Sequence, residues 1–259
     1  MRIVTLYSGS GGNATYIEAG GAAVLIDAGK SAKRLCAALC EIGVTPNSLD
    51  AIFITHEHSD HVSSLETLTK KHKIPIHIAS GCAARFCGER FSLLRECLVC
   101  HPPLFEVSIK DLTVKSFPTP HDSRMSVGYR LEFCEDGERH AIGLATDIGC
   151  VTDAIDSSLC GCEAVVLESN HDVDMLKGGP YPYDLKKRIL SKRGHLSNHE
   201  SAVFAASLVQ RGTKAFILAH LSEENNTPES ALGEFLGVVA DPGVKVAVAH
   251  PELATEIKF

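Results

Sequence analysis

Thr55-His56-Glu57-His58-Ser59-Asp60-His61 is the stretch of sequence that most constrains the fold. It comes directly after the apolar run Ala51–Ile54, which predicts a short buried strand that ends where the histidines begin. Imidazole nitrogens and carboxylate oxygens are the ligands that Zn²⁺ and similar ions prefer. Because His56 and His58 are two positions apart, their side chains point the same way in extended backbone and can share one ion. The stretch therefore predicts a metal-binding loop at the carboxyl end of a strand.

The pattern His-x-His-x-Asp-His in this stretch resembles the signature of the metallo-beta-lactamase superfamily. The resemblance implies an α/β fold, the four-layer αβ/βα sandwich, with a hydrolytic site for two metal ions at one end of its sheets. It also implies three further ligands in a fixed order. These are a His for the first ion, an Asp that bridges both ions, and a last His for the second ion.

Three later residues occur in that order, and each follows a predicted strand. His121 comes after Leu112–Phe117, Asp147 after Ala141–Ala145, and His220 after Ala215–Ala219. By the resemblance, one ion is held by His56, His58 and His121, the other by Asp60, His61 and His220, and Asp147 bridges them. Asp27, at the end of another strand, is expected to support the metal loop without binding metal.

The rest of the apolar pattern predicts further short strands and a few helices. Strands are expected at Ile3–Leu6, Thr15–Glu18, Ala23–Ile26, Pro75–Ile78, Phe105–Ile109, Val127–Phe133 and Ala164–Leu167. Helices are expected at Ser31–Ile42, Val62–Lys71 and Glu200–Gln210, the last capped by Ser197 or Asn198. Apolar residues also recur at helical spacing through Cys82–Cys97. The Gly-rich loop Ser8–Asn13 lacks the G-K-[ST] of a P-loop, so it predicts a tight hairpin.

Several segments resemble the YycJ/WalJ branch of the superfamily, small proteins described as 5′→3′ DNA exonucleases. The segments are Ser8–Asn13, His56–His61, Glu168–Asp172, Gly194–Asn198 and His220–Asn226, and the resemblance covers about residues 2–250. The segment that begins Gly194-His195 is also similar to one in the tRNA-processing enzyme RNase Z. The chain has no obvious long insertion that could grip tRNA, which disfavours that activity.

By resemblance to RNase Z, His195 is the candidate general acid that protonates the leaving oxygen, with Glu168 as its support. A positioned acid contributes roughly 10²–10⁴-fold to the rate. A His near a helix start can instead serve only as a cap or a packing residue, and that alternative stays open. Asp60 is a second candidate catalytic residue, because it could orient the attacking water.

Less specific signals predict the contacts to substrate. Asn170, Asn225 and Asn226 could donate hydrogen bonds to phosphate oxygens, although Asn is also common in turns. His171 could support a ligand, contact substrate or serve the fold. The basic segment 186–193 contains Lys187 and Arg193 as candidate phosphate contacts, although such runs are also common on solvated faces.

Two ions that share a water lower its pKa and can clamp a phosphodiester for in-line attack. We therefore expect a two-metal phosphodiesterase, a DNA 5′→3′ exonuclease, with RNA as the other polymer to consider. The alternatives are a small-molecule hydrolase (cyclic phosphodiesterase, glyoxalase-II-like thioesterase or lactonase), RNase Z-like processing of RNA, and a non-catalytic metal protein. Zn²⁺, Mn²⁺ and Fe²⁺ all suit the predicted ligands.

Composition sets the remaining expectations. The chain has 259 residues, 44% of them hydrophobic, and no linker divides it, so residues 1–259 are expected to form one domain. No apolar run approaches the ~18–20 residues of a membrane helix, and the start does not resemble a signal peptide. A cytoplasmic location is expected, and with it ten free cysteine thiols. The net charge of −7 argues against a generally basic nucleic-acid binder.

Overall fold

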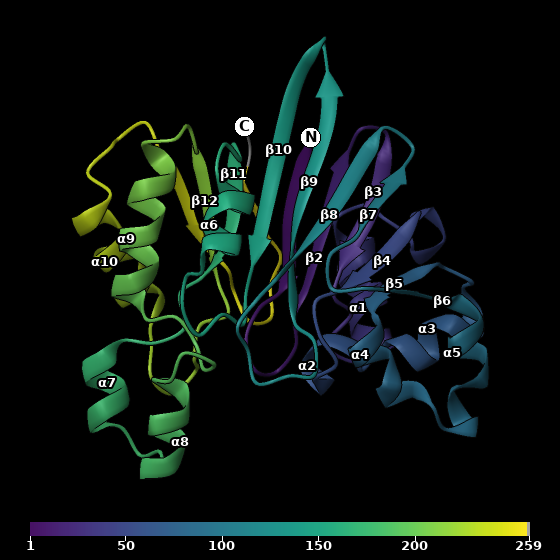
Figure 1. The fold of residues 1–259 in the computed structure, drawn as a ribbon, viewed down its shortest axis with the longest axis horizontal. Helices are drawn as coiled ribbons and strands as arrows, with labels where there is room; N and C mark the ends of the chain where they lie inside the picture. The colour runs from purple at the N-terminus through teal and green to yellow at the C-terminus, as the bar shows by residue number, and fades with distance from the viewer. Residues whose placement is uncertain (258–259) are drawn as a thin grey trace.

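Two seven-stranded sheets pack face to face in the computed structural model, which describes residues 1–257 (Figure 1). In the first sheet, the order is β14-β1-β2-β3-β4-β5-β6. Its strands are β1 (Arg2–Tyr7), β2 (Ala14–Ala19), β3 (Ala22–Ile26), β4 (Ala51–Ile54), β5 (Ile76–Ala79), β6 (Leu98–His101) and β14 (Thr255–Ile257). From β3 to β6 the strands are parallel, and β14, β1, β2 and β3 pair antiparallel.

The second sheet has the order β13-β12-β11-β10-β9-β8-β7. Its strands are β7 (Glu106–Ile109), β8 (Leu112–Pro118), β9 (Val127–Glu135), β10 (Glu138–Ala145), β11 (Ala164–Glu168), β12 (Ala215–Ala219) and β13 (Lys245–Val248). Strands β7 to β10 form an antiparallel meander, and β10 to β13 are parallel. Each sheet thus has a parallel half, in which the inner strands β4, β11 and β12 are buried along their whole length because both faces are covered.

Helices cover the outer face of each sheet and complete four layers. The α-helices are α1 (Ala32–Glu41), α2 (Ser59–Val62), α3 (Leu65–Lys71), α4 (Ser80–Ala83), α5 (Ser92–Cys97), α6 (Asp153–Leu159), α7 (Val173–Gly178), α8 (Tyr183–Ile189), α9 (Asn198–Val209) and α10 (Pro228–Val238). Three short 3₁₀ turns are η1 (Pro46–Ser48), η2 (Ala84–Phe86) and η3 (Glu89–Phe91). The predicted αβ/βα sandwich is confirmed.

Three apolar clusters hold these layers together. One packs α1, α3 and α5 against the first sheet, and another packs α6, α9 and α10 against the second. The third lies between the sheets and contains side chains of both, such as Ile17 and Tyr129. This shared core supports the expectation of one domain, which stays a prediction. Among the described residues, no helix is long and apolar enough to cross a bilayer.

Two predicted helices differ from those in the structure. The helix expected at Val62–Lys71 is two helices, α2 and α3, and α2 already begins inside the metal-binding loop. Cys82–Cys97 forms a series of short helical turns, because the backbone becomes extended at Gly88, with φ −70° and ψ 154°. All ten cysteines are free thiols, as expected.

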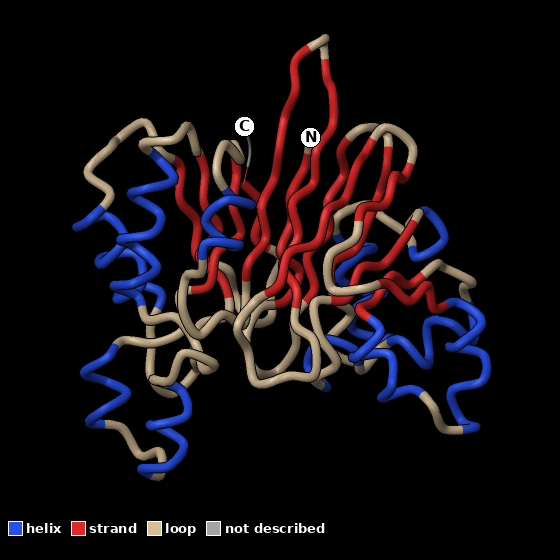
Figure 2. The backbone as a smooth tube through the Cα atoms, in the orientation of Figure 1, coloured by secondary structure: helices blue, strands red, loops and turns tan. Residues whose placement is uncertain are grey.

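Loops from both sheets gather at one end of the sandwich, and the β9–β10 hairpin projects from the opposite end (Figure 2). Helices α7 and α8, joined through residues 179–182, form an arm that extends beyond the loop end (Figure 1). The functional candidates of the sequence lie at this loop end.

Candidate metal centre

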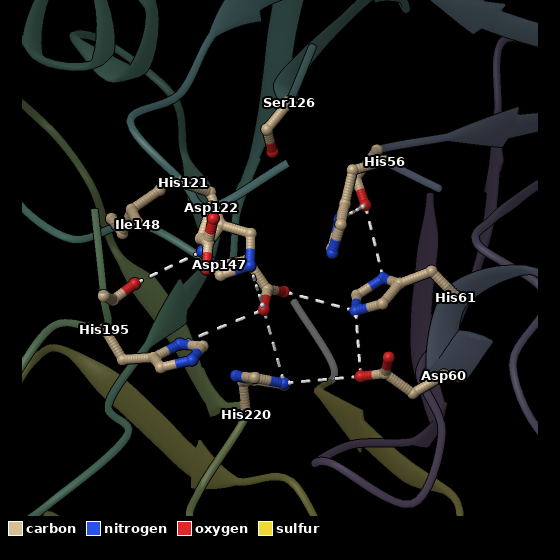
Figure 3. Close-up of polar contacts among 12 residues, drawn as sticks. His56, Asp60, His61, His121, Asp122, Ser126, Asp147, Ile148, His195 and His220 are labelled. Carbon is tan, nitrogen blue, oxygen red and sulfur yellow. Dashed lines mark hydrogen bonds and ion pairs between the residues drawn. The ribbon is translucent and has the colours of Figure 1, made fainter. Parts of the chain in front are cut away.

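The seven predicted metal ligands converge at the loop end, and both sheets contribute to them. His56, His58, Asp60 and His61 follow β4 in the first sheet, whereas His121, Asp147 and His220 follow β8, β10 and β12 in the second. Asp147 lies at the centre (Figure 3). Its carboxylate oxygens are 3.3 Å from Nε2 of His61, 3.5 Å from Nε2 of His220 and 3.7 Å from Nε2 of His121.

Side-chain atoms of two predicted ligand sets lie close enough to surround one ion each. His56, His58 and His121 form one group, and Asp60, His61 and His220 form another, with ligand atoms within 4.8 Å of one another in each. A further group joins Asp147 to His56 and His61. Asp147, Glu168, His195 and His220 also form a group of this kind, so geometry alone would let His195 act as a ligand.

Outward hydrogen bonds fix the orientation of four of the imidazoles. Nδ1 of His61 donates to Asp27 at 2.8 Å, and Nδ1 of His56 donates to the Thr55 hydroxyl at 3.1 Å. In the second sheet, Nδ1 of His121 donates to the Gly194 carbonyl at 3.3 Å, and Nδ1 of His220 donates to Glu168 at 2.9 Å. Each pairing engages Nδ1 and turns Nε2 inward, which is how metal-binding histidines are usually held.

The backbone at the ligand positions is strained in the second sheet. Asp147 and His220 have φ values of 55° and 58°, in the left-handed region that L residues rarely adopt. Such conformations cost roughly 1–3 kcal/mol and persist where the surroundings enforce them. In the first sheet Gly29 lies against the Asp60 carbonyl so closely that a Cβ would clash. Both features indicate that the backbone here is shaped to position the site, at some cost in local stability.

The charge balance of the cluster suits divalent cations. Burial, together with the neighbouring rings of His61 and His121, holds the pKa of His56 well below its ordinary value, so this ring stays neutral as a ligand must. Burial alone would raise the pKa of Asp147, but the rings of His220, His61 and His121 more than offset it and keep the carboxylate ionised. Nε2 of His56, Nε2 of His220 and Oδ2 of Asp147 are buried without a hydrogen-bond partner among the described residues. Buried polar atoms are seldom left unpaired, so these residues fit metal ions.

The predicted acid and its support form a tight pair beside this cluster. Glu168 is fully buried, and its Oε1 accepts from Nδ1 of His195 at 2.8 Å and from Nδ1 of His220 at 2.9 Å. Its Oε2 accepts from the backbone N–H groups of Ile148 and Leu196. Four donors therefore hold one carboxylate, which fixes the ring of His195 against the cluster.

The predicted substrate contacts divide into three kinds of environment. Asn170 lines the cavity beside the cluster, and its amide donates to the His220 carbonyl at 2.8 Å. Asn225 and Asn226 are buried behind it, and the Asn226 amide donates to Ser169, Asn170 and Asn198. His171 is 1% exposed, and neither ring nitrogen has a partner among the described residues. The structure thus places Asn170 on the cavity, and Asn225 and Asn226 in its scaffold.

Most of the basic segment 186–193 contacts the protein itself. Nε and Nη2 of Arg193 donate to the His121 carbonyl at 3.1 and 2.9 Å. Lys186 donates to the carbonyls of Lys177 and Gly179 and ties α8 to α7. Arg188 pairs with Asp122 at 2.9 Å on the surface. Lys187 and Lys192 are exposed, so Lys187 remains available to a substrate, while Arg193 supports a predicted ligand.

Three site residues were not predicted from the sequence. Nδ2 of Asn13 lies 3.1 Å from Nε2 of His61 and 3.3 Å from Asp60, and the Ser8 hydroxyl accepts from the His220 backbone N–H at 2.6 Å. Glu57 accepts from the Cys82 thiol and from the Arg124 backbone, and so joins the metal-binding loop to the loop of His121. The position of Glu57 inside the His-rich stretch was a signal that could have identified it.

Known proteins share the sequence pattern and the fold. Residues 7–129 match the sequence profile of the Metallo-beta-lactamase superfamily. The exodeoxyribonuclease YycJ of Bacillus anthracis is 33% identical over 98% of this chain and 97% of its own length. The exodeoxyribonuclease WalJ of Streptococcus pneumoniae is 35% identical over 97% and 95%. The short form of human tRNase Z has a similar fold, with a TM-score of 0.68, 19% identity and full coverage of both chains.

Proposed function

The chain belongs to the metallo-beta-lactamase superfamily and is a metal-dependent hydrolase, and we propose that it is a two-metal 5′→3′ exonuclease acting on DNA. One observation carries the proposal. A cluster that fits two divalent ions lies beside a His–carboxylate pair, His195 and Glu168, which can protonate a poor leaving group. The names of the relatives support DNA as the substrate.

In the hydrolysis of a phosphodiester, each of these groups has a separate role. Divalent ions held by the cluster would supply a water of lowered pKa, and positive charge beside the phosphate. The water oxygen bonds to phosphorus, and the proton that the water loses passes to bulk solvent. The bond from phosphorus to the leaving oxygen breaks, and that oxygen takes the proton of Nε2 of His195. Asp60, whose side chain is 22% exposed, is the carboxylate placed to orient the water.

Substitution of His195 tests its assigned role as the general acid. His195→Ala should keep its metal content and lose on the order of 10²-fold or more in cleavage of DNA. The loss should be smaller for bis(p-nitrophenyl) phosphate, because nitrophenolate leaves without protonation. His199→Ala is the matched control, since His199 lies four residues on, is exposed and pairs with Glu234 at the surface.

Two results would contradict the assignment of His195. Loss of one metal ion per chain would make it a ligand, which its grouping with Asp147, Glu168 and His220 allows. Equal rate losses for good and poor leaving groups would make it a residue that positions substrate.

The nuclease function itself is tested with matched strands. A linear single-stranded DNA, a circular DNA of the same sequence and a linear RNA are incubated with Mn²⁺ or Zn²⁺. Cleavage of the linear DNA only, from its 5′ end, is the expected result. Rapid cutting of the circular DNA would overturn exonuclease action, and preference for RNA would favour the RNase Z-like alternative.

A small-molecule hydrolase is the second candidate, and the size of the cavity beside the cluster, about 220 Å³, is the observation that favours it. Hydrolysis of a cyclic nucleotide, a thioester or a lactone, with every polymer left intact, would establish it instead.

A further inference from the structure

A cavity of about 220 Å³ adjoins the metal cluster on the side of His195. His121, His195 and His220 contribute to its lining from the cluster. The arm contributes Tyr181, Leu185 and Ile189, from α8 and the segment before it. The cavity therefore lies between the chemistry of the site and the arm that extends beyond the loop end (Figure 1).

We infer that this cavity binds the single terminal nucleotide that departs with the leaving oxygen. The inference rests on the nuclease function proposed above. A general acid must touch the oxygen that it protonates, so the nucleoside attached to that oxygen must lie next to His195. In a 5′→3′ exonuclease that releases 5′-mononucleotides, the leaving oxygen is the 3′-oxygen of the first nucleotide. The occupant is thus the 5′-terminal nucleotide.

The size of the cavity suits one nucleotide. Pockets for drug-sized ligands have volumes of roughly 300–1,000 Å³, so the cavity of about 220 Å³ suits one small ligand unit, such as a single nucleotide. Helix α8 forms part of the cavity wall, through Leu185, Arg188 and Ile189. Binding by the first nucleotide alone would therefore explain why cleavage begins at an end.

The cavity has an apolar wall that suits the base of a nucleotide and polar groups that suit its sugar and phosphate. Tyr181, Leu185 and Ile189 offer an aromatic ring and apolar carbon to a base, and stacking on an aromatic side chain contributes ~1–3 kcal/mol per base without regard to sequence. Asn170 and Ser222 offer polar groups to the sugar and phosphate.

Arg188 also lines the cavity and offers a guanidinium group to a terminal phosphate. Its partner is Asp122, in a surface pair with both side chains more than half exposed. Exchange of such a pair for a phosphate costs little, because surface ion pairs are weak.

Several features of the arm restrict the motion of its cavity-lining residues. Pro180 and Pro182 flank Tyr181 and restrict the backbone on both sides. Nζ of Lys186 donates to the carbonyls of Lys177 and Gly179, each at 2.7 Å, and so fixes α8 to the end of α7. A wall that is ordered before binding loses less entropy when the nucleotide arrives.

The test is a substitution on the arm that fills part of the cavity. Leu185→Trp places a larger side chain on the half-buried cavity side of α8. Leu190→Trp is the matched control, because Leu190 ends the same helix, is 46% exposed and does not line the cavity. We measure kcat/KM on a 5′-phosphorylated linear DNA and on bis(p-nitrophenyl) phosphate, and we identify the first product released by the wild-type protein.

The expected results are mononucleotide products from the wild type and, for Leu185→Trp, at least a tenfold fall in the ratio of the DNA rate to the ester rate. Leu190→Trp should keep the wild-type ratio. Tyr181→Ala, which removes a side chain and adds none, should raise KM for DNA several-fold and covers the case in which the larger residue prevents folding.

An unchanged ratio in a folded Leu185→Trp variant, or first products of two or more nucleotides, would overturn the cavity assignment while leaving the nuclease function intact. Failure of the wild type to cut any strand while it hydrolyses the ester would overturn the nuclease function, and this inference with it.

Discussion

At the scale of single residues, the site depends on side chains that hold the ligands as much as on the ligands. Arg193 shows this most clearly. Its guanidinium donates twice to the His121 carbonyl, and the next residue, Gly194, accepts the Nδ1 proton of the same imidazole. Backbone and ring of one predicted ligand are thus both fixed by residues 193–194, directly before His195.

Arg193→Met should therefore weaken metal binding, by about 10–100-fold as is typical when an outer partner of a metal ligand is removed. Lys192→Met, at the exposed neighbouring position, should leave metal affinity unchanged. Competition with a chelator of known affinity measures both. Normal metal affinity combined with weaker DNA binding in Arg193→Met would instead return Arg193 to the phosphate contact that the sequence suggested.

At the scale of elements, the strands were predicted well because their signal is local. Short, fully apolar runs such as Ala51–Ile54 and Ala215–Ala219 become buried parallel strands with bounds that match the prediction. The convergence of the candidate ligands at the ends of such runs was predictable for the same reason, since parallel strands end at a common edge.

The arm and the edge strand β6 could not be predicted in this way. Residues 173–190 contain Gly178, Gly179, Pro180 and Pro182, which interrupt any helical periodicity, and the helices there depend on the Asp172 cap and on contacts of Lys186. Leu98–His101 is only four residues long and partly exposed. Helices that depend on caps and side-chain contacts more than on an apolar repeat leave little periodic signal in the sequence.

A column of four stacked rings runs from Phe53 in β4 to Phe105, directly before β7. It contains two histidines, so the stability of the fold should depend on pH here. His77 stacks on Phe53 at 4.7 Å between centroids and lies 2.9 Å from His101 through ring nitrogens, and His101 stacks in turn on Phe105. Burial, and then the neighbouring His101 ring, lower the pKa of His77 to about 4. An unfolded His has a pKa near 6.5.

Between pH 6.5 and 4, the unfolded chain therefore binds a proton at His77 that the folded chain does not. The free energy of unfolding should fall as the pH falls through this window, by about 1–2 kcal/mol after allowance for solvent screening. His77→Phe should lose this contribution and His72→Phe should keep it. Urea unfolding of the metal-free proteins at pH 7 and 4.5 measures the difference, and equal pH dependence in all three would show that the column does not titrate.

At the scale of the whole molecule, the candidate metal centre is shared by the two sheets. Four predicted ligands follow β4 in the first sheet, and the other three follow strands of the second. The ions would thus connect the layers at the loop end, where charged and polar groups replace the apolar core that joins them elsewhere. Within the protein, ion pairs such as those of Asp147 with His61 and His220 join groups of the two sheets at this end.

Metal should therefore stabilise the entire sandwich, and not one sheet alone. A ligand that binds only the folded state adds about 4 kcal/mol at a free concentration 1,000 times its dissociation constant. Chelation should lower the melting temperature and increase amide exchange in β4 and β12 together. His58→Ala and His220→Ala, which remove one ligand from each sheet, should both reduce the gain from added metal, while the exposed control His199→Ala should keep it. Faster exchange in one sheet only, or separate melting of the two sheets after chelation, would contradict this prediction. Either result would show that the apolar core alone couples the sheets and that residues of one sheet alone bind the ions.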